Sequence, residues 1–123
     1  MPPYAQHLWF QPGWGGVPLS GTAPRSGGYL SYRDEPSVYD RRALGLLIDS
    51  WWPSFLTHET QMRPMGTTSI QVTFMMPEAV RGPFLLQVQG QALADGFGVE
   101  DNHLWDSEGR LVAIAQQTIA MIR

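Results

Sequence analysis

The hydrophobic period of this chain changes once, near residue 67, and that change limits the folds open to it. The segment from Val38 to Trp52 carries apolar residues at the close spacing of a helix with one buried face. The segments Thr67–Met76 and Phe84–Leu93 instead alternate from residue to residue, as strands do when one face is buried and the other is wet. The chain is therefore expected to place a single helix before a set of strands.

Local signals predict where these elements begin and end. Ser37 and Asp40 resemble a variant of the capping box that opens a helix at about Val38, and Pro53 should end that helix near Trp52. Asp95–Gly96 and the run Asp106–Gly109 are typical of hairpin turns. With a last strand over Leu111–Met121, the sequence from residue 67 onward predicts four strands in an antiparallel meander.

The first 28 residues are rich in Pro, Gly and aromatic residues. They predict a short extended segment over Tyr4–Phe10 followed by an ordered loop, and Tyr29–Arg33 is expected to form a short strand. One helix must bury its apolar side on the sheet. A helix wrapped by a curved antiparallel sheet of five or six strands is the hotdog fold, which we expect as one α+β domain over residues 1–123; other α+β sheets stay open as alternatives.

Composition excludes several classes of function. The chain has a net charge of −3 and eight scattered arginines, so it offers no basic surface for nucleic acid. No segment reaches the roughly 18 to 20 apolar residues that span a bilayer, and the first residues lack the pattern of a signal peptide. Without cysteine there is no thiol nucleophile and no thiolate metal site. A cytoplasmic protein with no membrane or nucleic-acid partner is expected.

Gln117 is the one polar residue on the apolar face of the last predicted strand. Its neighbours on that face are all apolar, namely Leu111, Ala113, Ala115, Ile119 and Met121. A buried carboxamide must find hydrogen-bond partners or lose free energy. Gln117 is therefore either a satisfied core amide or a group that faces a bound ligand, and the pattern leaves both open.

Five stretches stand out by their order and spacing: Leu46–Pro53, Thr67–Phe74, Ala94–Phe97, Leu104–Asp106 and Gly109–Ala113 running on to Gln117. Together they resemble the second half of the acyl-CoA thioesterase II (TesB-like) double-hotdog proteins. The resemblance covers nearly the whole chain and is weakest over residues 1–28.

The resemblance implies hydrolysis of an acyl-CoA thioester by a water molecule held by an Asp, a Thr and a Gln, without a covalent intermediate or a cofactor. These family residues fall on Asp49, Thr67 and Gln117. Burial beside Leu46, Ile48 and Trp52 is expected to raise the pKa of the Asp49 carboxyl, as suits a base. Strand alternation puts Thr68 on the face of Ile70, so Thr67 points inward only if a bulge interrupts the strand; Thr68 is assigned to substrate binding.

Family members usually carry two hotdog units, and the site forms where the units meet. This sequence resembles one unit, so a homodimer, a homotetramer or a separate hotdog partner chain is expected. The rival hypothesis is a non-catalytic unit that binds an acyl ligand or partners a catalytic subunit. Trp51 and Trp52 are expected to cover the core or a dimer face. The three His residues share no ligand spacing, so no metal site is expected, and Met62, Met65, Met75 and Met76 line either an acyl tunnel or the core.

Overall fold

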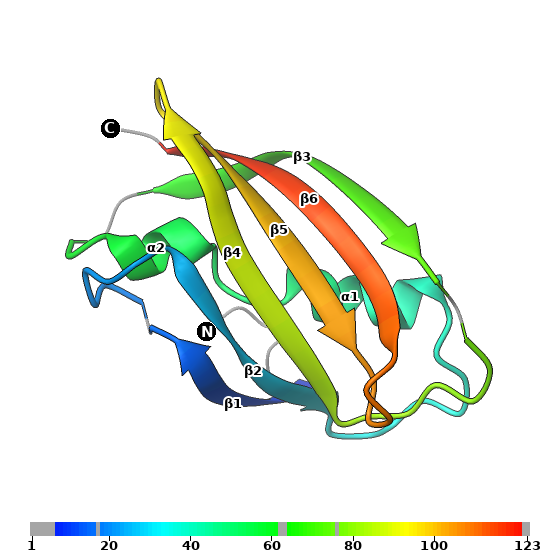
Figure 1. Cartoon of the computed structure of the whole chain (residues 1–123). Coiled ribbons are helices and arrows are strands. Elements are labelled where there is room, and N and C mark those ends of the chain that lie inside the picture. The colour runs from blue at the N-terminus through cyan, green and yellow to red at the C-terminus, as the bar shows by residue number, and fades with distance from the viewer. Residues whose placement is uncertain (1–6, 17, 62–63, 76, 122–123) are drawn as a thin grey trace.

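The structure is a computed structural model that describes residues 7–16, 18–61, 64–75 and 77–121. Six strands form one antiparallel sheet in the order β1-β2-β4-β5-β6-β3. Two helices lie against one face of the sheet, and the other face is open in Figure 1. The elements are β1 (Leu8–Gly15), β2 (Arg25–Tyr32), α1 (Arg41–Asp49), α2 (Ser54–His58), β3 (Met65–Phe74), β4 (Phe84–Ala94), β5 (Phe97–Trp105) and β6 (Leu111–Met121).

The hotdog architecture is confirmed, with the six-stranded sheet curved over the helices (Figure 1). The predicted helix is α1, which ends at Asp49, before Pro53. The short helix α2, which begins directly after Pro53, was not predicted. Helix α1 also begins later than predicted, since Asp40 rather than Ser37 is the cap: its carboxylate accepts a hydrogen bond from the Ala43 N–H at 2.9 Å. None of the described helices is long and apolar enough to cross a membrane.

The predicted four-strand meander is wrong for its first member. Strands β4, β5 and β6 do form consecutive hairpins, but β3 pairs with β6 at the edge of the sheet. The connection from β3 to β4, residues 75–83, is longer than the two to five residues of a hairpin loop, so it lets the chain cross to the far side of the meander. Alternation within a strand does not specify its neighbour, which is why the pattern missed this order.

The first two strands have other bounds than predicted. The extended segment expected over Tyr4–Phe10 overlaps β1 only at Leu8–Phe10, residues 4–6 lie outside the described residues, and β1 continues to Gly15 through the predicted loop. The short strand expected at Tyr29–Arg33 starts at Arg25 and ends at Tyr32. Among the described residues, β1 is an edge strand of the sheet and pairs only with β2. Pro12, which has no N–H to donate, is tolerated in an edge strand. The Asp95–Gly96 turn is confirmed, and both of its residues have positive φ, 55° and 80°.

The main core lies between α1 and the sheet. The helix buries Leu44, Leu47 and Ile48 against β5 and β6, with Leu104 fully buried beneath them. Trp51 belongs to this core, as predicted, and its indole N–H donates to the Ser26 hydroxyl at 2.9 Å. Burial of these apolar side chains supplies the main driving force for this packing, about 1.5 to 3 kcal/mol for each large side chain.

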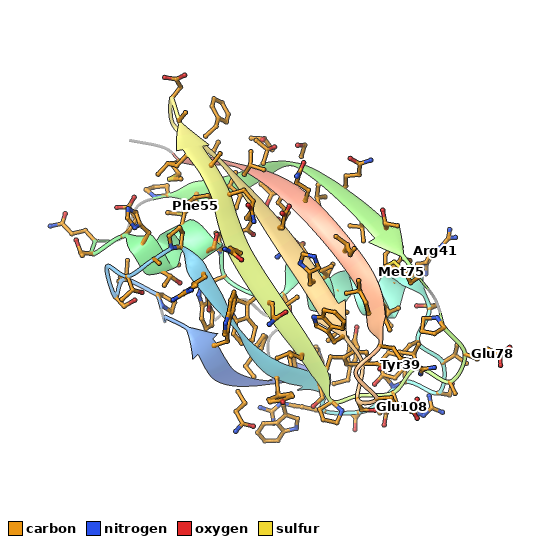
Figure 2. All side chains as sticks on the ribbon, viewed as in Figure 1. Tyr39, Arg41, Phe55, Met75, Glu78 and Glu108 are labelled. Carbon is orange, nitrogen blue, oxygen red and sulfur yellow. The ribbon has the colours of Figure 1, made fainter. Side chains whose placement is uncertain are left out.

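A second, smaller apolar cluster surrounds Phe55 on α2. Its other buried members are Ile119 and Met121, and Met65 packs against it. The Phe55 ring lies where any side chain at Gly90 or Gly98 would stand, so these glycines let α2 approach β4 and β5 (Figure 2). Met65 therefore serves this cluster, Met75 is 38% exposed, and Met62 and Met76 lie outside the described residues.

Candidate active site

Gln117 lies between the two apolar clusters on the inner face of β6. The predicted face is confirmed: Ala113, Ala115, Ile119 and Met121 are buried with it, and Gln117 itself is 5% exposed. Its Oε1 accepts a hydrogen bond from the Thr67 hydroxyl at 3.0 Å, and its Nε2 donates to the Asn102 Oδ1 at 3.2 Å. The amide is thus held by neighbours, yet it retains one N–H and one oxygen lone pair for a further partner.

A bulge in β3 decides which threonine meets Gln117. Thr67 pairs with Ile119 and Ser69 with Thr118, so the register with β6 shifts by one residue at Thr68. The shift turns the Thr67 hydroxyl toward Gln117, whereas the Thr68 hydroxyl donates to the Thr118 carbonyl at 3.1 Å. The irregularity that the sequence required for an inward Thr67 is therefore present, and the structure does not bring Thr68 to Gln117.

Asp49 is the last residue of α1. The expected burial is wrong for the single chain, because the Asp49 side chain is exposed and makes no hydrogen bond to any residue that the structure describes. The expected direction of its pKa is confirmed: although the residue is exposed, neighbouring atoms exclude part of the water around the carboxyl and so raise its pKa. The carbonyl end of a helix is also an unfavourable place for a negative charge.

Glu100 is the residue that sequence reasoning missed. It lies on β5 directly opposite Gln117 and is only 2% exposed. The Ser54 N–H and the Ser54 hydroxyl both donate to its Oε2, at 2.8 and 2.7 Å. Asn102 lies two residues later on the same face of β5 and is also buried. Ser54 opens α2, so the start of the second helix is tied to the site.

The pKa of Glu100 is raised above its ordinary value. Burial is the largest cause, the hydrogen bonds from Ser54 and Asn102 oppose it, and the nearby Asp49 charge raises it further. The last of these causes links the two carboxyl groups electrostatically across the space between α1 and β5. The Asp49 charge is thus near enough to act on the pKa of Glu100, and Gln117 lies opposite Glu100 in the sheet.

The sequence contains little signal for Glu100. The inner face of β5 carries Gly98, Glu100, Asn102 and Leu104, and the outer face carries Phe97, Val99, Asp101, His103 and Trp105. Counting apolar residues selects the outer face as the buried one. Each face also holds two polar residues at alternate positions, so alternation alone does not identify Glu100 as buried.

The described side chains indicate which chemistry this locality can perform. A carboxyl with a raised pKa, a hydroxyl and an oriented amide suit the binding and deprotonation of water. Among the residues that the structure describes, no three His, Asp or Glu side chains gather closely enough to bind a metal ion. The polar groups present are thus those of general acid–base chemistry.

A scan against family models matches residues 2–121 to the acyl-CoA thioesterase C-terminal domain. No curated protein matches the chain. Solved structures with a similar fold include a hot dog fold protein of unknown function from Alicyclobacillus acidocaldarius (TM-score 0.83, 17% identity, 98% of this chain and 47% of that one). An acyl-CoA thioesterase II, TesB2, from Mycobacterium marinum is also similar (TM-score 0.77, 18% identity, 97% and 50%).

The AziG protein of S. sahachiroi matches over nearly its full length, with a TM-score of 0.73, 21% identity, and coverage of 98% of this chain and 97% of that one. The chain thus spans about half the length of the first two proteins and almost all of the third. At these identities the likeness concerns the fold, and the family model carries the assignment of family.

Proposed function

We propose that this chain, which belongs to the acyl-CoA thioesterase C-terminal domain family, hydrolyses an acyl-CoA thioester to the free acid and CoA with a water molecule held by Asp49, Thr67 and Gln117. The observation that carries the proposal is the hydrogen bond from Thr67 to Gln117, formed across a strand bulge. Two of the three residues implied by the motif are thereby joined, although 50 positions separate them in the sequence.

In the proposed reaction the water donates one hydrogen bond to Asp49 and the other to the Gln117 Oε1, which leaves an oxygen lone pair for attack on the thioester carbonyl. The new C–O bond forms as Asp49 takes up a proton from the water, and collapse of the tetrahedral intermediate breaks the C–S bond. The proton then passes from Asp49 to the departing CoA thiolate. A thioester carbonyl is electrophilic, so positioning and deprotonation of water are the main requirements.

The raised pKa of Asp49 supports its role as the base, because it brings the carboxyl nearer to the operating pH. General acid–base catalysis of this kind contributes roughly 10²- to 10⁴-fold in rate. Thr67 is proposed to fix the Gln117 carbonyl and to reach the same water. Thr68 keeps its proposed role in substrate binding only at the margin of this site, since its hydroxyl is bound to a backbone carbonyl.

A second hotdog unit is part of the proposal. Asp49 and Thr67 are exposed in the single chain, and Ile70 on the edge strand β3 is 43% exposed. Exclusion of bulk water strengthens the electrostatic interactions within an active site. A second copy, in a homodimer or homotetramer, or a separate hotdog chain would cover these groups. Sedimentation of the chain as a monomer at micromolar concentration would contradict the version with a second copy.

The second candidate is a non-catalytic unit that binds an acyl ligand or partners a catalytic subunit. It is favoured by the two hydrogen bonds that already hold Gln117 and by the lack of any hydrogen bond to Asp49 within the described residues. A satisfied amide and an exposed carboxylate are common in proteins without activity.

Release of CoA from a panel of acyl-CoA substrates, followed with a thiol reagent, separates the two candidates. The hydrolase predicts turnover that Gln117→Ala reduces by about 10²-fold or more, as expected when a group that positions the reacting water is lost. Gln116→Ala is the matched control, because Gln116 is exposed on the opposite face of β6 and bonds Asp101 there. Ligand binding without turnover at every chain length would favour the non-catalytic unit.

A further inference from the structure

We propose that Glu100 is a positioning residue that fixes the orientation of the Gln117 amide through Asn102. The inference rests on the proposed hydrolase function for its consequence, and on the hydrogen bonds of the described residues for its geometry. Neither Glu100 nor Asn102 is part of the motif that identified Asp49, Thr67 and Gln117.

The series of hydrogen bonds begins at a group that can only donate. A backbone N–H can only donate, and the Ser54 N–H donates to the Glu100 Oε2 at 2.8 Å. The Ser54 hydroxyl donates to the same oxygen at 2.7 Å. An ionised carboxylate only accepts, and hydrogen bonds to it are stronger than those between neutral groups. Ser54 therefore anchors Glu100 as a fixed acceptor, buried at 2% exposure.

Asn102 lies between Glu100 and Gln117, and its orientation depends on the acceptor at Glu100. It lies two residues after Glu100 on the same inner face of β5 and is 1% exposed, and donation from its side chain acts to lower the pKa of the Glu100 carboxyl. Because the carboxylate accepts, Asn102 must present its amide nitrogen to Glu100 and turn its Oδ1 the other way. That oxygen then accepts from the Gln117 Nε2 at 3.2 Å.

Gln117 is the last amide in the chain. Once its nitrogen faces Asn102, its Oε1 must face Thr67, whose hydroxyl donates to it at 3.0 Å. With Glu100 ionised, the order from Ser54 through Glu100, Asn102 and Gln117 to Thr67 runs in this direction. Asp49 is the charged group that faces Glu100 from α1.

The direction matters for the proposed reaction. With its oxygen on the Thr67 side, Gln117 can accept a hydrogen bond from the water and leave the water lone pair free. With the amide reversed, the Gln117 N–H would donate to that lone pair and oppose attack on the carbonyl. Glu100 thus affects the reaction only through Asn102 and Gln117.

Three variants in the full chain test this inference. Glu100→Gln would still accept from Ser54 but would present an N–H to Asn102, which reverses Asn102 and then Gln117. Asn102→Asp would place a second carboxylate against Glu100 without a donor between them. In the double variant E100Q/N102D, the amide introduced at position 100 donates to the carboxylate introduced at position 102. That carboxylate accepts from Gln117, so the original direction and the net charge both return.

We expect kcat to fall about tenfold or more in each single variant, the scale on which outer partners of a catalytic group act. The KM for acyl-CoA should change little, and the double variant should regain most of the lost kcat. A merely structural role for Glu100 would not produce this rescue. A double variant no more active than E100Q, with all variants folded by thermal melting, would overturn the inference.

The side-chain amide signals of Gln117 in NMR spectra supply a measurement that needs no activity. In the wild-type chain the Gln117 amide protons should lie nearer to Asn102 than to the Thr67 methyl group, and E100Q should reverse this. Wild-type protein without turnover but with these contacts would defeat the proposed function and leave the orientation supported. Wild-type amide protons nearer to Thr67 would overturn the inference even if no variant folds.

Discussion

Two carboxylates, Glu100 within β5 and Asp106 just after it, are both almost fully buried, at 2% and 5% exposure. Asp106 is paired with Arg110, whose guanidinium nitrogens lie at 2.7 and 2.8 Å, and it also accepts from the N–H groups of Glu108 and Arg110. Glu100 has neutral donors from Ser54 and Asn102 and the Asp49 carboxylate nearby. One carboxylate is neutralised by a cation, and the other faces another anion.

The pKa values follow this difference. Burial tends to raise the pKa of Asp106, but the bonds from Arg110 and the turn more than offset it and hold that pKa below its ordinary value. Burial raises the pKa of Glu100. A fully satisfied charge that closes a turn is a structural device, whereas a buried charge kept without a cation is typical of functional sites. Asp106 therefore has a structural role at the end of β5, whereas Glu100 belongs to the candidate active site.

The largest effect should come from Asp49 at the site. Asp49→Asn removes the proposed base and should lower kcat/KM by roughly 10²- to 10⁴-fold. The melting temperature should not fall, because the folded state disfavours the charge that the variant removes. Asp34→Asn, at an exposed loop position, is the control that should leave turnover unchanged. A loss of less than threefold in Asp49→Asn would remove this residue from the mechanism.

Asp106→Asn should affect stability instead of activity. It weakens the bonds from Arg110 and from two backbone N–H groups, and we expect the free energy of unfolding to fall by about 2 to 3 kcal/mol, the scale of hydrogen bonds to charged groups. Urea unfolding gives this value. The rate per folded molecule should match the wild type, and a selective loss of kcat would break the division between the two ends of the sheet.

A smaller effect should distinguish the two neighbouring threonines at the bulge. Thr67→Ala loses the hydrogen bond to Gln117 and should reduce kcat about 2- to 10-fold, equivalent to one hydrogen bond of ordinary strength. Thr68→Ala should leave kcat unchanged, because its hydroxyl bonds the Thr118 carbonyl. Equal losses in steady-state assays of the two variants would show that the bulge does not select between them.

The smallest effects concern the pH dependence of stability. The folded-state pKa of Glu100 is raised, so its contribution is full below the unfolded-state pKa and is lost as pH rises through the folded-state pKa. The folded-state pKa of Asp106 is lowered, so its contribution is present above the unfolded-state pKa and is lost as pH falls through the folded-state pKa. The free energy of unfolding, measured with urea at a series of pH values, should contain two opposite slopes. Glu100→Gln should remove the decrease with rising pH, and Asp106→Asn should remove the decrease with falling pH.

Much of the fold could be predicted from period and turn chemistry. The inner face of β6 and the Asp95–Gly96 turn are local features, and the structure confirms them. The place of β3 beside β6 could not be predicted, because it depends on pairing across the chain that alternation does not encode. The short helix α2 was within reach, since Pro is tolerated where a helix begins as well as after one ends.

Some residues of the candidate site could be predicted from the sequence, and others could not. Gln117 stood out as a polar residue among apolar neighbours, and Asp49 and Thr67 came from the resemblance to a family. The exposure of Asp49 could not be foreseen from a helix pattern, because it depends on where the helix ends relative to the sheet. Glu100 was hidden because polar residues on the inner face of β5 made the outer face look like the buried one.

The central claim, that Asp49 acts as a base on water, is tested most directly by a single turnover of acyl-CoA in water enriched with ¹⁸O. Direct attack by water predicts that the free acid from this first turnover carries one ¹⁸O atom and that the Asp49 carboxylate carries none. An unlabelled acid together with ¹⁸O in Asp49 would mean that the carboxylate itself attacked the thioester, and it would contradict the account.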